Sequence, residues 1–402
     1  MEIYDVIIIG GGAAGLASAV LSAKKGLKTL VLEKSDRVGK KLLLTGNGLG
    51  NICNKNISPV FFHSENEVKK NAYLRKFSLK DALEFFDFLN IPTTSINNKI
   101  YPQSLQASSV LDALRIKCNT LNVNVKTGFG VTKVQPSGAY IEVCGDNVNY
   151  LGNKVIVATG GCTYPRLNSD GNGYKLFESY GHKVIKPCPS LVQLKCEGVS
   201  SMNLKGIKTD VDATLFVNGK PVKSENGELL FTDYGVSGPV IFNLSGEASR
   251  ALFNSHKVEL KINLSPLCDP LKELQKRKSS MGEAPLLELF NGYFKKQFTR
   301  PIFSKASIST FERTVSSLDS IEIFAISKAI TAFDLKVVSS LGFENAQATI
   351  GGLSLDDFDD NLMSLKIKNV FAAGEIVDID GDCGGYNLFW AWASANIIVN
   401  SF

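Results

Sequence analysis

The residues best placed to do chemistry form a run of glycines near the N-terminus. Gly10-Gly-Gly-Ala-Ala-Gly15 follows the pattern G-x-G-x-x-G. Gly10 permits a tight turn, Gly12 lets the backbone approach a pyrophosphate, and Gly15 lets a helix pack closely on a strand. Backbone N–H groups at the start of that helix would face the phosphates. The run therefore predicts a dinucleotide site.

An acidic residue stands where such a site needs one. Glu33 follows Gly15 by 18 residues, and its carboxylate can accept hydrogen bonds from the ribose hydroxyls of adenosine. A ribose 2′-phosphate would be repelled there, so the pattern favours FAD or NAD and not NADP as the tightly bound dinucleotide.

The flanking segments have the order that this chemistry requires. Residues 4–9 form an apolar, β-branched run that predicts a buried parallel strand. Residues 16–25 predict a helix, Gly26 its end, and residues 27–32 a second strand that stops at the acid. An isolated G-x-G-x-x-G is a weak signal, but strand, helix, strand and acid in register make it specific.

The stretch after the second strand distinguishes FAD from NAD. Residues 34–54 are rich in lysine and glycine, including Lys34, Lys40, Lys41 and the turn from Asn47 to Gly48. Such a stretch suits a longer ligand whose pyrophosphate and flavin run past it. An ordinary exposed loop is the alternative.

Two later strands end in a similar way. Residues 154–161 form an apolar strand that ends in a turn of small residues at Thr159 and Gly160. Residues 369–381 form another, which ends at Gly374 beside the carboxylate of Glu375. Three strand ends that share one ligand imply a discontinuous nucleotide domain with an insertion.

The C-terminal segment predicts contact with the flavin ring. Residues 381–395 form a glycine turn that leads into a helix, with Tyr386, Asn387 and Leu388 at its start. Free N–H groups at a helix start carry partial positive charge and would stabilise the reduced ring at its N1/C2=O edge. The alternative is a plain helix cap with tryptophans in the core.

The middle of the chain has a different pattern. Residues 191–264 alternate apolar and polar side chains between turn signals, which predicts β-structure. Residues 269–331 have helical periodicity, and residues 334–341 predict a further strand.

Composition limits the class of protein. The chain has 402 residues, a formal net charge of +5 and eight cysteines without metal-binding spacing. We expect no metal, no nucleic-acid partner and no membrane span, and the N-terminus lacks the pattern of a secretory signal. Free, buried thiols favour a cytoplasmic location.

Together these motifs resemble the BaiN/YhiN-type flavoproteins, which include aminoacetone oxidase-like and bile-acid dienone reductase-like members. The resemblance implies an FAD domain interrupted by a β-barrel-like domain that carries a helical lid. This chain departs from the family at four positions: Leu49, Gly50, Cys53 and Phe389 replace arginine, cysteine, threonine and glutamine, respectively. The replacement of arginine by Leu49 bears on substrate choice. The motifs that carry the resemblance are Gly10–Gly15, Gly39–Gly48, Ala158–Pro165, Leu230–Pro239, Ala348–Leu353, Phe371–Glu375 and Gly384–Leu388.

The predicted fold is therefore α/β, with a discontinuous Rossmann-like FAD-binding domain, an inserted β-barrel-like domain and a helical lid. The predicted boundaries are 1–190 and 345–402 for the FAD domain, 191–267 for the β domain, 268–332 for the lid, and 333–344 for a strand returning to the β domain. The predicted cofactor-binding residues are Gly10, Gly12, Ala13, Ala14, Gly15, Glu33, Lys34, Lys40, Lys41, Asn47, Gly48, Asn51, Val131, Thr159, Gly160, Gly374, Glu375, Gly385, Tyr386, Asn387 and Leu388.

The predicted function is that of an FAD-dependent oxidoreductase, in which flavin N5 exchanges hydride with a small organic substrate bound at a domain interface. A reductase supplied by NADH or NADPH is the main hypothesis. An oxygen-dependent amine or aminoketone oxidase is one alternative, and a flavin-binding protein acting through a partner or nucleic acid is another. No catalytic acid or base is assigned, although Tyr164 is a candidate proton donor.

Overall fold

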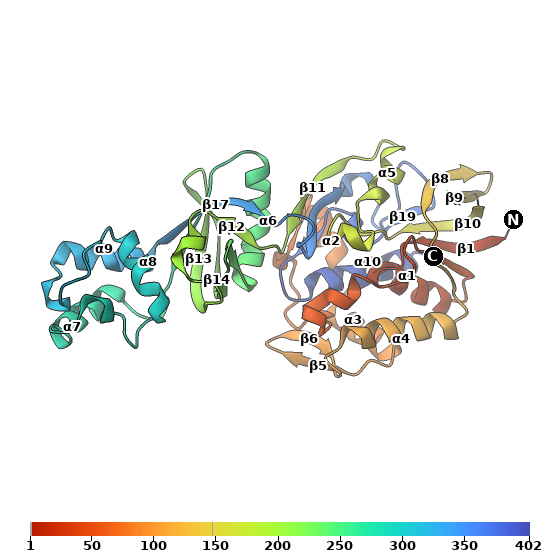
Figure 1. The fold of residues 1–402 in the computed structure, drawn as a ribbon. Coiled ribbons are helices and arrows are strands. Elements are labelled where there is room, and N and C mark those ends of the chain that lie inside the picture. The colour runs from red at the N-terminus through yellow and green to blue at the C-terminus, as the bar shows by residue number, and fades with distance from the viewer. Residues whose placement is uncertain (1, 147) are drawn as a thin grey trace. The chain divides into compact units, whose positions relative to one another are not determined.

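The computed structural model describes residues 2–146 and 148–402. The chain forms two compact units, which are described separately below (Figure 1). The first unit is discontinuous and comprises Met1–Pro189 and Ala346–Phe402, and the second comprises Ser190–Asn345.

A seven-stranded sheet is the centre of the first unit. Its order is β7-β2-β1-β10-β9-β8, and β19 also pairs with β10. The pairs among β7, β2, β1, β10 and β19 are parallel, whereas β8 and β9 add an antiparallel edge. The strands are β1 (Ile3–Ile9), β2 (Thr29–Leu32), β7 (Asn124–Lys126), β8 (Val131–Ser137), β9 (Tyr140–Gly145), β10 (Val148–Val157) and β19 (Val370–Ala372).

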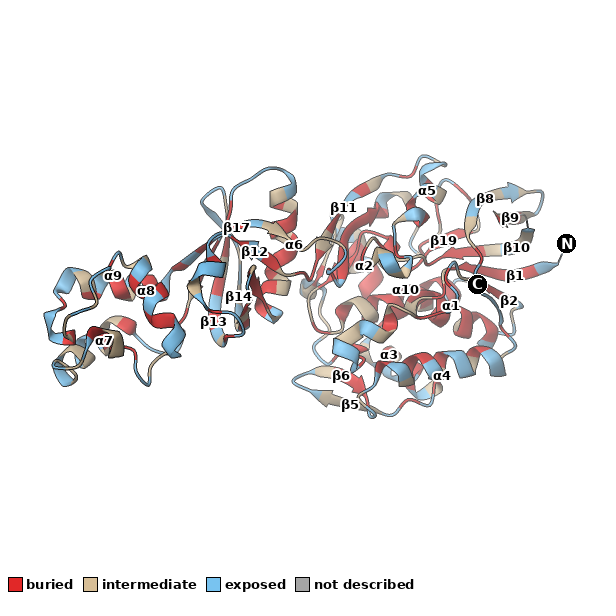
Figure 2. Cartoon of the chain, in the orientation of Figure 1, coloured by how far each residue is buried: buried red, intermediate tan, exposed pale blue. Residues whose placement is uncertain are grey.

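The parallel strands are buried because helices cover them. Val6, Ile7 and Ile8 of β1 are fully buried, and Figure 2 shows the central strands in red. Strands covered on both faces favour continuous apolar runs. The helices of this unit are α1 (Ala13–Lys24), α2 (Glu67–Leu74), α3 (Leu79–Phe88), α4 (Ala107–Thr120), α5 (Asn172–Glu178) and α10 (Tyr386–Asn400).

Three small sheets complete the first unit, and two of them pair its N-terminal segment with its C-terminal segment. β11 (Val184–Ser190) pairs with β18 (Ala348–Leu353). The other two sheets join β3 (Cys53–Asn54), β6 (Lys99–Pro102) and β5 (Thr93–Ile96), and β20 (Asp380–Gly381) with β4 (Phe62–His63).

The second unit is built on a closed barrel with the order β12-β15-β14-β13-β16-β17. Val211, Ala213 and Leu215 alternate inward along β13, as the two-residue period of a strand requires. The barrel strands are β12 (Leu194–Cys196), β13 (Lys208–Val217), β14 (Lys220–Phe231), β15 (Gly235–Ser237), β16 (Val258–Asn263) and β17 (Phe333–Ser340). The helices are α6 (Pro239–Phe253), α7 (Pro270–Ser280), α8 (Thr299–Lys305) and α9 (Ser320–Thr331).

One element of the second unit differs from the sequence prediction. The β-structure expected over residues 191–264 is interrupted by helix α6. Pro239 begins this helix, where a missing N–H and a fixed φ are favourable. Val240, Ile241, Leu244 and Ala248 are buried at helical spacing, which the alternation on either side obscured.

The predicted fold class is confirmed: the structure has a Rossmann-type sheet, a closed antiparallel barrel and additional helices. Among the described residues, no helix combines the length and apolar character that a membrane span requires.

Candidate functional site

The glycine loop between β1 and α1 begins the site, and its geometry explains the residue types. Gly10 has φ +104°, and a Cβ there would lie 2.5 Å from the carbonyl oxygen of Ala158. A Cβ on Gly15 would lie 1.9 Å from the carbonyl oxygen of Gly10, so α1 packs closer than a side chain allows. A Cβ on Gly12 would meet nothing within 4 Å, because Gly12 borders open space.

Glu33 fixes this loop from the end of β2. Its Oε2 accepts a hydrogen bond of 2.7 Å from Gly11 N–H, and its Oε1 accepts one of 2.7 Å from Ser35 N–H. Both carboxylate oxygens are therefore oriented by the backbone. Each keeps a further lone pair with which to accept a hydroxyl donor.

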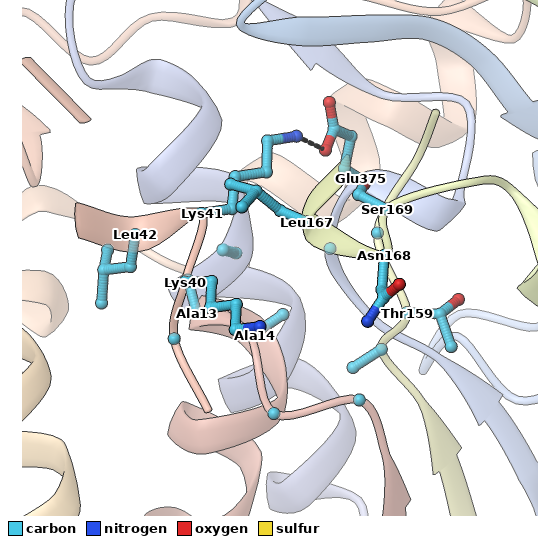
Figure 3. A pocket seen from close by; sticks show the side chains of 18 of the residues that line it. Ala13, Ala14, Lys40, Lys41, Leu42, Thr159, Leu167, Asn168, Ser169 and Glu375 are labelled. Carbon is cyan, nitrogen blue, oxygen red and sulfur yellow. Dashed lines mark hydrogen bonds and ion pairs between the residues drawn. The ribbon is translucent and has the colours of Figure 1, made fainter. Parts of the chain in front are cut away.

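A pocket opens in front of the loop, entirely within the first unit (Figure 3). Together with the open solvent at its mouth, the space in front of the loop amounts to about 1000 Å³. Its lining residues are Gly10–Ala14, Glu33, Ser35, Arg37, Gly39–Leu42, Thr45, Ala158–Gly160, Leu167–Ser169, Gln347, Ala373–Glu375, Asn387, Leu388 and Ala391.

One part of the lining, here called the charged wall, consists of Glu33, Arg37 and Lys40. Arg37 is exposed and makes no hydrogen bond or ion pair within residues 2–146 and 148–402. Lys40 Nζ lies 2.5 Å from Oδ1 of the exposed Asp36, where solvent screens the pair. The charged wall adjoins the start of α1, whose free N–H groups also favour an anion.

A second part, here called the uncharged wall, consists of Thr45, Asn387, Leu388 and Ala391. Neither segment that supplies it, 42–54 or 383–402, contains Asp, Glu, Lys or Arg. The last three residues lie near the start of α10, where no side chain caps the first turn. Its partial positive charge is therefore the main electrostatic feature of this wall.

Hydrogen bonds to the backbone hold the uncharged wall in place. Asn387 bonds twice to the backbone of Gly381, through Oδ1 at 2.9 Å and Nδ2 at 2.7 Å. Trp390 Nε1–H donates to the carbonyl oxygen of Gly374 at 3.1 Å, and Trp392 Nε1–H to that of Ile52 at 2.9 Å. Both tryptophans are buried and fasten α10 to segments beside the pocket.

Lys41 and Glu375 face each other from different segments (Figure 3). Lys41 Nζ lies 2.5 Å from Glu375 Oε2 and also donates to Thr163 Oγ1. Glu375 Oε1 accepts from Thr349 N–H at 2.6 Å. Both charged side chains are part of the pocket lining.

The family model described as "HI0933-like protein Rossmann domain" matches residues 4–400. The chain belongs to this family. The 3-dehydro-bile acid delta(4,6)-reductase of Clostridium scindens is 30% identical over 96% of each chain. The ribosomal RNA dihydrouridine synthase of Escherichia coli K12 is 26% identical over 98% of this chain and 97% of its own.

Among solved structures, 3-ketosteroid delta1-dehydrogenase from Sterolibacterium denitrificans is similar in fold, with a TM-score of 0.51, 12% identity and complete coverage of both chains. Membership of the HI0933-like family confirms the predicted resemblance. The predicted class, a flavin-dependent oxidoreductase, is likewise confirmed.

In this HI0933-like chain, many of the predicted cofactor residues line the pocket together. They come from the glycine loop, the end of β2, the lysine-rich segment, the ends of β10 and β19, and the start of α10. These residues are Gly10, Gly12, Ala13, Ala14, Glu33, Lys40, Lys41, Thr159, Gly160, Gly374, Glu375, Asn387 and Leu388.

Other predicted residues lie outside the lining. Lys34 pairs with Asp170 at 2.8 Å, and Gly15 serves the packing of α1. Asn47 and Gly48 are exposed in the loop after Leu42. Val131 begins β8 at the far edge of the sheet.

The remaining predicted residues support the uncharged wall from behind. A Cβ on Gly385 would lie 2.7 Å from Asn51 Oδ1, so Asn51 packs against the start of α10. Tyr386 stacks on Phe61 with ring centroids 4.9 Å apart, and its hydroxyl donates to the carbonyl oxygen of Asn56 at 3.3 Å. Burial raises the pKa of Tyr386 to about 12.

The pocket also contains residues that the sequence reasoning missed. Ser35, Arg37 and Gly39 follow Glu33 directly, so extending the motif would have found them. Asn168 reaches the site through a hydrogen bond of 3.0 Å from its Nδ2 to Ser35 Oγ, and nothing local in the sequence signals this. The other missed residues are Gly11, Leu42, Thr45, Ala158, Leu167, Ser169, Gln347, Ala373 and Ala391.

The thiols near the site are suited to packing. Cys53 and Cys162 form no disulfide. Burial raises the pKa of Cys53 to about 12 and that of Cys162 to about 11. Such thiols remain protonated at neutral pH and are poor nucleophiles.

Proposed function

We propose that the pocket binds FAD and that the protein is an NAD(P)H-dependent reductase of carbon–carbon double bonds conjugated to a carbonyl group. The observation that carries the proposal is the union, in one pocket, of the glycine loop, Glu33 and the uncapped start of α10. Bound FAD would supply a two-electron carrier that accepts or delivers hydride at N5.

The residues present fit this cofactor. Gly12 leaves room beside the start of α1, where a pyrophosphate binds in such folds. Lone pairs of Glu33 remain for ribose hydroxyls, while Asn387 and Leu388 border the space that we assign to the flavin ring. FMN lacks the adenosine part and would leave Glu33 and Arg37 unused.

The substrate chemistry is inferred from the relatives. The names of the Clostridium scindens and Escherichia coli proteins both describe the addition of two hydrogens across carbon–carbon double bonds. A small neutral enone is the substrate class we favour, because the uncharged wall offers no cation to an anionic ligand.

Reduction of uridine in RNA is the second candidate, and the name of the Escherichia coli relative favours it. RNA binding draws much of its affinity from contacts of lysine and arginine with phosphates. The formal net charge of +5 is a small excess for 402 residues, so we rank this candidate below the small molecule.

Anaerobic stopped-flow spectroscopy tests the proposal. NADH or NADPH should bleach the flavin, and a neutral enone should then restore its colour faster than oxygen does. Faster recovery with a uridine-containing RNA would establish the second candidate. If neither nucleotide bleaches the flavin but an amine does, the protein is an oxidase and the proposal is wrong.

A further inference from the structure

Four hydrogen bonds form a ring that includes Lys41 and Glu375 of the pocket lining. The chain link between Cys162 and Thr163 closes this ring. Lys41 Nζ donates to Thr163 Oγ1 and to Glu375 Oε2, Thr349 N–H donates to Glu375 Oε1, and Cys162 N–H donates to Thr349 Oγ1 at 2.9 Å. The ring joins the segments that follow β2, β10 and β19 to β18. These residues are distant in sequence, so the ring fixes Lys41 and Glu375 against each other.

Inside the ring, the opposite charges of Lys41 and Glu375 compensate each other. The side chains of Lys41 and Glu375 are only 28% and 18% exposed, and their charged atoms lie 2.5 Å apart. A ligand therefore meets a nearly neutral unit there. Arg37 on the charged wall makes no ion pair with the described residues and presents its full charge.

Hydrogen-bonding capacity remains on both partners. The ammonium of Lys41 has three donors, of which two are used by Thr163 and Glu375. Each oxygen of Glu375 accepts one hydrogen bond from the protein and retains a free lone pair. A neutral unit with both donors and acceptors suits a hydroxyl group, whereas a phosphate is better served by uncompensated charge.

We propose that Lys41 is a positioning residue for the ribityl chain of the cofactor and is not a phosphate ligand. In this role Lys41 orients Glu375, and Glu375 contacts the ribityl chain. This inference rests on the proposed function. It separates Lys41 from Arg37, although both side chains line one pocket, and it makes Glu375 the acceptor that contacts the polyol.

Titration of full-length apoprotein with FAD and with ADP tests this proposal. ADP retains the adenosine and pyrophosphate but lacks the ribityl chain and flavin. We expect Lys41→Met to weaken FAD binding about tenfold to hundredfold, the effect of a charge-assisted hydrogen bond. ADP binding should change by less than about twofold, whereas Arg37→Met, the reference for a phosphate contact, should weaken both ligands equally.

A double-mutant cycle gives the second readout. Once Glu375→Gln is present, adding Lys41→Met should weaken FAD binding by no more than about threefold, because the two residues act as one unit. If Lys41→Met does not fold, Glu375→Gln alone decides: it should weaken FAD and leave ADP unchanged.

Three results would overturn the inference: equal loss of ADP and FAD binding in Lys41→Met, unchanged FAD binding in that variant, or additive losses in the double variant. Failure of the wild-type chain to bind FAD would instead refute the proposed function, and the first titration shows this before any variant is made.

Discussion

The charged and uncharged walls belong to one pocket but use different physical chemistry. The charged wall has side chains of Glu33, Arg37 and Lys40, and the uncharged wall has the start of α10 with Asn387 and Leu388. Charged side chains bind a ligand strongly, but they also attract counter-charges, and their own charge changes with pH. A helix start supplies partial positive charge without a titratable group.

The difference suggests a division of labour. Under the proposed function, the charged wall holds the adenosine and phosphates, which do not react. The uncharged wall holds the ring, whose charge changes during turnover, so fixed backbone dipoles suit it better than a mobile ion pair. Lys41 and Glu375 line the same pocket as a nearly neutral pair.

The largest effect is expected from reversing charge on the charged wall. Glu33→Arg removes two charge-assisted acceptors, each worth about 1.5–3 kcal/mol, from Gly11 and Ser35. FAD and ADP should both bind at least about a hundredfold more weakly in fluorescence titrations. Glu84→Arg, an exposed change on α3, is the matched control, and equal FAD affinity in the two variants would remove Glu33 from the site.

A charge introduced on the uncharged wall should slow reduction of the flavin and should change the affinity for FAD much less. Leu388→Glu places a carboxylate in the first turn of α10, where it would oppose the negative charge of the reduced ring. We expect FAD binding within about threefold of wild type, but reduction by NADPH at least about tenfold slower. Leu388→Met preserves volume and is the control. Equal reduction rates in both variants would show that the ring lies elsewhere.

Added salt should weaken the contacts of the ligand with the charged wall and not those with the uncharged wall. Raising NaCl from about 0.05 M to about 0.5 M shortens the Debye length severalfold. FAD and ADP should lose affinity by the same modest factor, since under the proposed function both would contact Arg37. A markedly larger loss for FAD would reveal a charged contact beyond the pyrophosphate and contradict the neutral character of Lys41 with Glu375.

The smallest effect is expected at the thiols. Cys268 is exposed, whereas burial raises the pKa of Cys53 to about 12. Raising the pH therefore leaves Cys53 protonated until the pH approaches that value. At about pH 8, iodoacetamide should modify Cys268 within minutes and leave Cys53 and the flavin spectrum unchanged. Mass spectrometry reads this out, and early labelling of Cys53 would indicate a reactive thiol beside the cofactor.

The parts of the site that the sequence predicted carry recognisable local patterns: the glycine loop with Glu33, the ends of β10 and β19, and the start of α10. Gly10, Gly12 and Gly15 share one turn, and Glu33 lies one strand away. The fold class followed from the same local patterns of strand, helix and alternation. Helix α6 was missed because the apolar period of residues 239–253 lay between two strand-like stretches.

Other features depend on distant contacts that local patterns do not encode. Asn168 joins the pocket through Ser35, and Lys41 is neutralised by a residue 334 positions away. The sequence alone assigned Lys41 to a cationic loop. Only the folded chain shows that its charge is paired and that Asn51 lies behind the start of α10.

The identity of the released cofactor tests the central claim most directly. Purified protein is heated, and the supernatant is separated by chromatography against FAD and FMN standards. The account predicts one equivalent of FAD, because only a dinucleotide uses Glu33 and Arg37 as well as the start of α10. Recovery of FMN, or of no flavin after reconstitution with FAD, would contradict it.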